Sequence, residues 1–83
     1  MNLKNKTPKE IKEIFTTGRI FYKFREKYHV IGYIFDGDEE FIIVKSWNKW
    51  KNCWCREVWD FDFMSGYEVR SGYINLTKPK MPK

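Results

Sequence analysis

Residues 28–47 read YHVIGYIFDGDEEFIIVKSW, and this stretch decides the fold because two apolar runs flank a short polar segment. The Asp-Gly-Asp segment at 36–38 is a hairpin signal, since glycine tolerates a positive φ and an aspartate side chain can hydrogen-bond its own backbone. Residues 40–47 are therefore expected to run back against residues 28–36. Residues 41–44 are apolar on both faces, which predicts a central strand with a helix covering one side.

The N-terminal flank predicts a helix followed by another strand. Thr7-Pro8-Lys9-Glu10 has the form of a capping box, and the apolar Ile11, Ile14 and Phe15 follow at helical spacing until Thr16-Thr17-Gly18 ends the pattern. From Ile20 the apolar side chains alternate with a period of two, which predicts a strand. We expect the turn into the 28–36 strand at Glu26-Lys27.

The C-terminal flank is less regular. Residues 48–52 read as a loop, and residues 53–63 read as a long fourth strand with aromatic rings on one face. Trp47, Trp50 and Trp54 also stand at i, i+3 and i+7, so a helical turn through 47–54 is an open alternative.

Two glycines then separate the last apolar segments. Gly66 and Gly72 punctuate residues 67–70 and 73–76, either of which could form an edge strand. The expected fold class is α+β, with one short N-terminal helix packed on a four- to five-stranded antiparallel sheet. Whether this sheet stays open or rolls into a small SH3-like barrel is undecided at this point.

The length of 83 residues predicts one domain, and its net charge of +5 comes from the ends. Residues 1–9 and 78–83 hold six Lys and no acid, whereas residues 10–77 carry ten bases and eleven acids. We expect residues 1–6 and 78–83 to be flexible, solubilising basic tails. The small basic protein contains neither a membrane span nor a signal-peptide pattern, so we expect it in the cytoplasm, and its Lys-rich composition suggests a bacterium or phage.

The aromatic content sets an expectation about binding. So short a chain needs most of its ring surface for its own interior, so most of Trp47, Trp50, Trp54 and Trp59 are expected in the core. Trp50, in the middle of a polar loop, is the ring most able to stay outside. Three or more indoles open to solvent along a cationic groove would overturn this expectation and favour an oligonucleotide ligand.

No set of residues forms a recognisable catalytic or metal site. Cys53 and Cys55 are too close in sequence for an unstrained disulfide, and with His29 they fall short of a zinc ligand set, so we expect reduced thiols filling small apolar space. Asp60 and Asp62 fit the polar face of a strand. We expect no enzyme activity, metal or cofactor, and keep a magnesium nuclease using Asp60 or Asp62 only as a third class of function.

Two charged clusters remain as candidate partner-binding sites. Bases surround the Trp residues near one end of the predicted hairpin, and acids crowd its other turn. The candidate residues are Lys45, Lys49, Trp50, Lys51 and Arg56 at the basic end and Asp36, Asp38, Glu39 and Glu40 at the acidic end.

Such a dipolar surface favours a protein partner. The leading hypothesis is a small non-enzymatic protein-binding module, of the kind with which a phage or mobile element inhibits or redirects a host complex. The alternative hypothesis is a single-stranded nucleic-acid-binding protein that uses the Trp and Lys hairpin loop. A homodimer formed through strand edges is also open.

Overall fold

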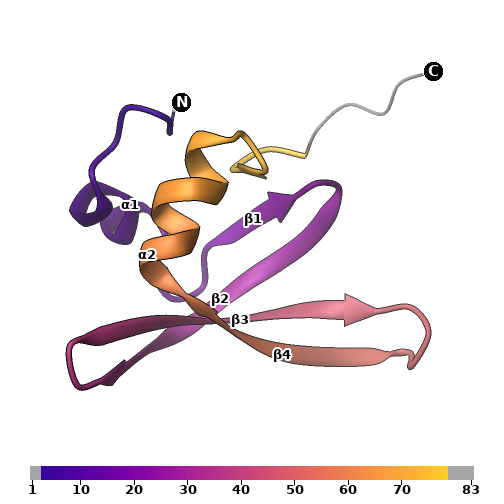
Figure 1. Ribbon diagram of the computed structural model, residues 1–83. Coiled ribbons are helices and arrows are strands. Elements are labelled where there is room, and N and C mark those ends of the chain that lie inside the picture. Colours follow the sequence, from indigo (N-terminus) through magenta and orange to yellow (C-terminus); the bar gives the residue numbers. More distant parts are fainter. Residues whose placement is uncertain (1–2, 79–83) are drawn as a thin grey trace.

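A computed structural model describes residues 3–78, in which an antiparallel sheet carries helices on one side (Figure 1). The elements are α1 (Pro8–Ile14), β1 (Ile20–Lys23), β2 (Glu26–Asp36), β3 (Glu39–Asn48), β4 (Cys53–Asp60), α2 (Phe61–Phe63), the π-helical η1 (Met64–Glu68) and β5 (Ile74–Asn75). The five strands lie in the order β4-β3-β2-β1-β5. The expected α+β class is confirmed, but the sheet is not closed into a barrel, because β4 and β5 form its two separate edges.

The β2–β3 hairpin is the one predicted. Its register pairs Asp36 with Glu39 and Tyr28 with Ser46, and Gly37 in the turn has a φ of 64°. A β-bulge at Ile31 shifts the register between the two halves of β2, which increases the local twist. β3 lies between β2 and β4, so the expectation that residues 41–44 form an interior strand is confirmed.

The preceding turn differs from its expected position. β2 already begins at Glu26, so the turn after β1 is formed by Phe24 and Arg25. Phe24 has a φ of 59°, and its backbone N–H donates to the Tyr73 carbonyl at 3.0 Å. The expected turn at Glu26-Lys27 is therefore wrong by two residues, and the hydrogen bond to Tyr73 helps to hold the turn at Phe24.

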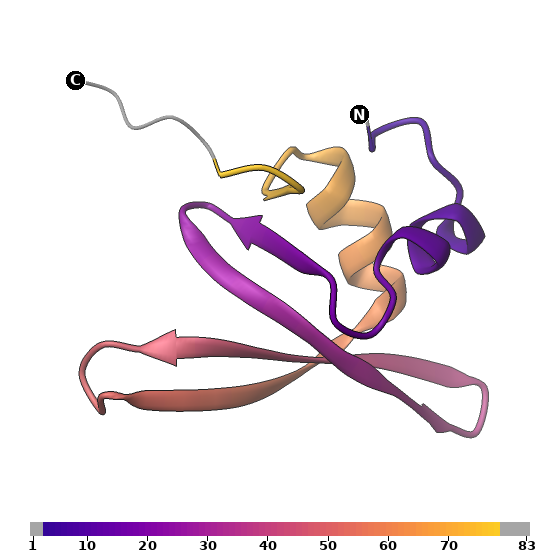
Figure 2. The same ribbon diagram turned by 180° about the vertical axis from the view of Figure 1, so that it is seen from behind.

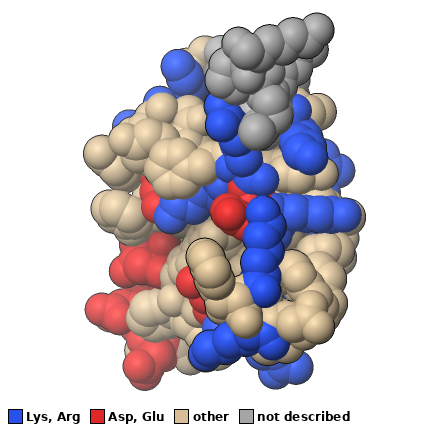
Figure 3. Space-filling view, turned by 90° about the vertical axis from the view of Figure 1, so that its right-hand side faces the viewer, with Lys and Arg blue, Asp and Glu red and all other residues tan. Residues whose placement is uncertain are grey.

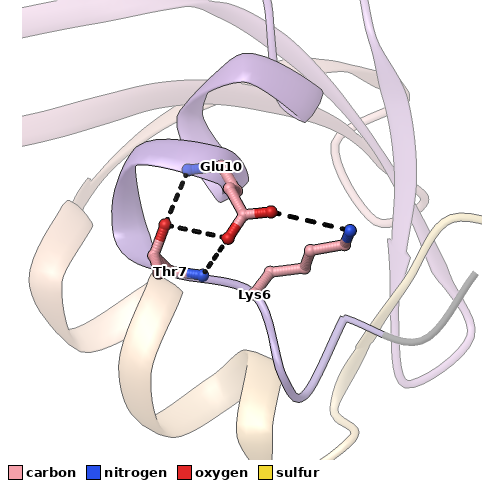
Figure 4. Close-up of polar contacts among 3 residues, drawn as sticks. All are labelled: Lys6, Thr7 and Glu10. Atoms are coloured by element: carbon pink, nitrogen blue, oxygen red, sulfur yellow. Dashed lines mark hydrogen bonds and ion pairs between the residues drawn. The ribbon is translucent and has the colours of Figure 1, made fainter.

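The capping box at the start of α1 is present (Figure 4). The Thr7 hydroxyl oxygen accepts from the Glu10 backbone N–H at 3.2 Å, and the Glu10 carboxylate accepts from the Thr7 backbone N–H at 3.1 Å. The hydrogen bond from the Thr7 backbone lowers the pKa of Glu10, and the Lys6 ammonium, 3.7 Å from its carboxylate, acts in the same direction. Two of the free N–H groups at the helix start are thus satisfied.

The chain after β4 is helical, contrary to expectation. Residues 61–70 form a helix in place of a strand end and an edge strand, and Asp60 caps it by accepting from the Phe63 N–H at 3.1 Å. Phe61, Met64 and Val69 are buried on one side of this helix. Residues 73–76 do supply an edge strand, in the shorter form of β5, which pairs with β1.

The core lies between the helices and one face of the sheet (Figures 1 and 2). Its buried residues are Leu3, Ile11, Phe15, Phe21, Val30, Ile42, Val44, Phe61, Met64, Val69 and Ile74. Leu3, within the expected tail at 1–6, is buried in the core, and the flexibility of that tail stays a prediction. The rest of the tail prediction at 1–2 and 79–83 lies outside the described residues, and Lys78 is exposed.

The alternation of side chains gives the sheet a covered face and an open face. Phe21, Ile42 and Val44 belong to the covered face, under the helices. Ile34 and Val58, on the open face, remain exposed. No helix within residues 3–78 is long and apolar enough to cross a membrane.

Candidate functional site

Three of the four indoles are open to solvent. Trp47 and Trp54 are cross-strand neighbours on the open face, with exposed fractions of 43% and 47% and ring centroids 5.5 Å apart at 78°. Trp50, in the β3–β4 turn, is 97% exposed. Only Trp59 packs against the core, beside Tyr28. The expectation that the chain buries most of its Trp residues is therefore wrong, because aliphatic side chains supply most of the buried core.

Period-two alternation explains where these rings lie. Ile42 and Val44 point into the core, so Lys45 and Trp47 fall on the opposite face of β3. On β4, Trp54 lies opposite Trp47 and shares the open face with Arg56, which pairs with Lys45. In the sequence, Lys45 stands two positions before Trp47, and Arg56 stands two positions after Trp54. Because residues two apart share a face of a strand, these bases indicate that the two rings face solvent.

A groove of about 470 Å³ lies between the β1–β2 and β3–β4 turns. It is lined by Arg25, Glu26, Lys27, Trp47, Lys49, Trp54 and Lys78. Four of these residues are cationic and one is acidic, so the groove is strongly basic although residues 10–77 as a whole are not. Figure 3 faces the end of the molecule that carries both turns, where Lys and Arg gather over the centre and right of the view and Asp and Glu lie along its left side.

Cations also lie against the exposed rings. The Lys45 ammonium is 5.1 Å from the centroid of the Trp54 ring, within the range of a cation–π contact. The His29 ring meets the same indole edge-on at 5.2 Å. Desolvation lowers the pKa of His29, and the charges of Lys45 and Lys27 lower it further. His29, Lys45 and Arg56 thus form a row of nitrogen-bearing side chains across three paired strands.

The β3–β4 turn holds Trp50 on an ordered backbone. The Asn48 side-chain oxygen accepts from the backbone N–H groups of Trp50 at 2.9 Å and Lys51 at 3.0 Å. Asn52 closes the turn with a φ of 54°, a conformation that asparagine adopts more readily than most residues. The exposed indole therefore projects from a structured tip, and the alternative of a helical turn through 47–54 is wrong.

The predicted partner-binding residues separate into two groups. Lys45, Lys49, Trp50, Lys51 and Arg56 lie on or beside the β3–β4 hairpin, whereas Asp36, Asp38 and Glu39 are exposed at the β2–β3 turn at the other end of β3. Glu40 differs from its neighbours, because it is half-buried and forms an ion pair with Lys12 of α1. Glu40 therefore joins α1 to the sheet.

Sequence reasoning missed Arg25, Lys27 and Lys78, and it expected most of the Trp residues in the core. Arg25 and Lys27 stand some 20 positions before the Trp cluster, but the pairing of Tyr28 with Ser46 brings them alongside it. The hairpin register could have revealed this proximity. Lys78 falls in a predicted tail, so nothing in the sequence marked it as part of a groove.

The residues weighed for metal or acid–base chemistry have other surroundings. Within residues 3–78, no group of three or more His, Cys, Asp or Glu side chains could hold a metal ion. Asp60 is engaged in capping the following helix. Cys53 is exposed and Cys55 half-buried, both as free thiols, so the expectation that they fill apolar space is wrong.

Comparison of the chain with protein-family models, with curated proteins and with solved structures finds no match.

Proposed function

We propose that the protein binds single-stranded nucleic acid in the groove between the β1–β2 and β3–β4 turns. The observation that carries this proposal is a groove lined by two half-exposed indoles, Trp47 and Trp54, four cationic side chains and one carboxylate, with the fully exposed Trp50 next in the chain to the groove residue Lys49. Flat rings flanked by cations suit a single strand, whose unpaired bases stack while its phosphates meet ammonium and guanidinium groups.

The exposed rings support a role outside the fold. Trp50 is 97% exposed, so its large apolar surface contributes little to the stability of the chain. Base–aromatic stacking returns roughly 1–3 kcal/mol per base and does not depend strongly on the base. The Asn48 hydrogen bonds order the tip in advance, which reduces the entropy lost when a base stacks there.

The local charge supports a polyanionic ligand over an apolar one. Arg25, Lys27, Lys49 and Lys78 come from three separate segments and line one groove. Lys45 and Arg56 extend the basic surface along the open face. The concentration of bases in one place, on a chain whose 10–77 segment is nearly balanced, is the arrangement that attracts phosphates.

A protein partner is the second candidate, favoured by the exposed acids at the opposite turn. Asp36, Asp38 and Glu39 give the molecule an acidic end that a nucleic acid would avoid. In this alternative the protein is a small binding module that occupies a surface of another protein complex, such as a phage protein that inhibits or redirects a host machine. Neutralising these acids would then weaken the complex.

The test is titration of the reduced full chain with oligothymidylate at low salt, monitored by Trp fluorescence. We expect quenching, and we expect Trp50→Ala to weaken binding about 10-fold, the equivalent of one stacked base. Phe63→Ala, an exposed ring outside the groove, is the matched control and should bind as the wild type does. Because Trp50 is exposed, its removal should change the stability by at most about 0.5 kcal/mol, which is a Tm shift of no more than roughly 2–4 °C. Absence of quenching at low salt, or equal losses for both variants, would contradict the proposal.

A further inference from the structure

Cys53 and Cys55 are two thiols that neither the core nor the proposed groove uses. They begin the edge strand β4, where residues two apart point to the same side, and their Sγ atoms are 4.0 Å apart. They share their face with Tyr28, opposite to the face that carries Trp54. Cys53 is exposed, Cys55 is half-buried, and both are free.

The distance between the two sulfur atoms suits a shared metal ion. At the ~2.3 Å metal–sulfur distance known for zinc thiolates, two thiolates on one ion lie ~3.8 Å apart at a tetrahedral angle, ~4.0 Å apart at 120° and ~4.6 Å apart in a straight line. The observed 4.0 Å corresponds to an angle near 120°. A suitable ion could therefore bind with little movement of the backbone, which β4 holds in place by pairing Cys53 with Asn48 and Cys55 with Ser46.

We propose that Cys53 and Cys55 form a binding site for a soft, thiophilic metal ion of low coordination number, with Cu⁺ as the ion that fits best. Soft thiolates select Cu⁺ over hard cations. A closed zinc site needs four ligands, and no described group of three or more His, Cys, Asp or Glu side chains supplies them. On binding, two S–H bonds break, two S–Cu bonds form, and two protons pass to solvent, while the copper keeps its oxidation state.

The surroundings fit a small exchangeable site. Cys53 is exposed at the start of the edge strand, so a small ion or an exchanging ligand can reach the pair from solvent. Lys51, in the adjacent turn, is near enough to interact electrostatically with Cys53, so its charge would offset part of the negative charge of two metal-bound thiolates.

The test presents Cu⁺ to the reduced full chain without oxygen, in competition with a chromogenic Cu⁺ chelator, and counts bound ions by native mass spectrometry. We expect one Cu⁺ per chain, and we expect loss of detectable binding in both Cys53→Ser and Cys55→Ser. His29→Asn, which removes the only imidazole and lies on the open face, is the matched control and should retain the ion.

Three outcomes would overturn the proposal: no bound Cu⁺, binding retained in either serine variant, or one ion shared by two chains. The serine variants should keep the Tm of the wild type, since neither thiol belongs to the buried core. Cys53→Ser should also leave oligonucleotide binding unchanged, because Cys53 lines neither the groove nor the adjacent hollow that Trp50 shares with Cys55, so this variant tests the metal site independently of the proposed function.

Discussion

The pKa of His29 depends on the charges that surround its imidazole. Its imidazole lies beside Trp54, and its pKa is lowered by desolvation and then by Lys45 and Lys27, which disfavours the imidazolium in the free protein. A phosphate chain bound near Lys45 and Lys27 would offset their repulsion and stabilise the imidazolium. The pKa of His29 should therefore be higher in the complex than in the free protein.

This difference predicts that oligonucleotide affinity rises as pH falls from about 8 to about 5.5. If the pKa of His29 rises by one unit on binding, the gain is at most about tenfold. His29→Gln should flatten the profile, which fluorescence titrations across this pH range can measure. An unchanged slope in the variant would contradict the prediction. The stability of the folded protein should instead decrease as the pH falls below ~6.5. The pKa of His29 is lower in the folded state, so the unfolded chain binds the proton more tightly.

The secondary structure was predictable where local signals agree and was missed where they compete. Thr7, Gly37 and the apolar run at 41–44 each indicate one structure, and α1 and the β2–β3 hairpin are as expected. After β4, the alternation of Trp59, Phe61 and Phe63 is typical of a strand, but the same segment also carries an N-cap at Asp60 and apolar residues at helical spacing. Burial of Phe61, Met64 and Val69 against the sheet decides in favour of the helix.

The candidate site was predictable only in part, for a related reason. The hairpin pattern placed Trp50, Lys49 and Lys51 correctly in an exposed turn. The expectation that a short chain buries its rings is wrong for Trp47 and Trp54, because their positions in β3 and β4 fall on the open face of the sheet. Lys78 joins the groove through the tertiary fold alone, which no local pattern reports.

The cap of the second helix is a contact whose loss should be measurable. Asp60→Ala should destabilise the protein by about 1 kcal/mol, because the Phe63 N–H loses its acceptor. Asp60→Asn should retain most of the stability, since asparagine caps as well as aspartate. Urea denaturation followed by circular dichroism measures both values. A large loss for the asparagine variant would mean that Asp60 acts through its charge and not as a cap.

A substitution at Asn48, in the β3–β4 turn, should weaken binding with little effect on folding. Asn48→Ala removes two hydrogen bonds that order the tip, so Trp50 would have to be ordered on binding. We expect oligonucleotide affinity to fall about 3- to 10-fold, the equivalent of one or two rotatable segments immobilised at ~0.5–1.5 kcal/mol each. The Tm should fall by only a few degrees, because the turn lies outside the core. If the affinity of Asn48→Ala is unchanged, the preformed conformation of the β3–β4 turn does not contribute to oligonucleotide binding.

The charges of the whole molecule are divided between two ends, and salt should affect them differently. The longest dimension is 40 Å, whereas the Debye length is only about 8 Å at physiological ionic strength, so the acidic turn and the basic groove act almost independently there. Asp36→Asn combined with Glu39→Gln should therefore leave oligonucleotide affinity unchanged at that salt. The same variant should weaken a complex in which a protein partner contacts the acidic end.

The groove itself should give a defined salt dependence. If Arg25, Lys27, Lys49 and Lys78 each meet one phosphate, the logarithm of the association constant should fall with the logarithm of salt concentration with a slope of about −3, from ~0.7 per contact on a single strand. Lys49→Gln should reduce the magnitude of the slope by ~0.7, while Lys9→Gln, an exposed lysine on α1, should leave it unchanged. Titrations at several salt concentrations give the three slopes. A slope equally reduced by both substitutions would mean that the net charge of the chain, and not the groove, attracts the strand.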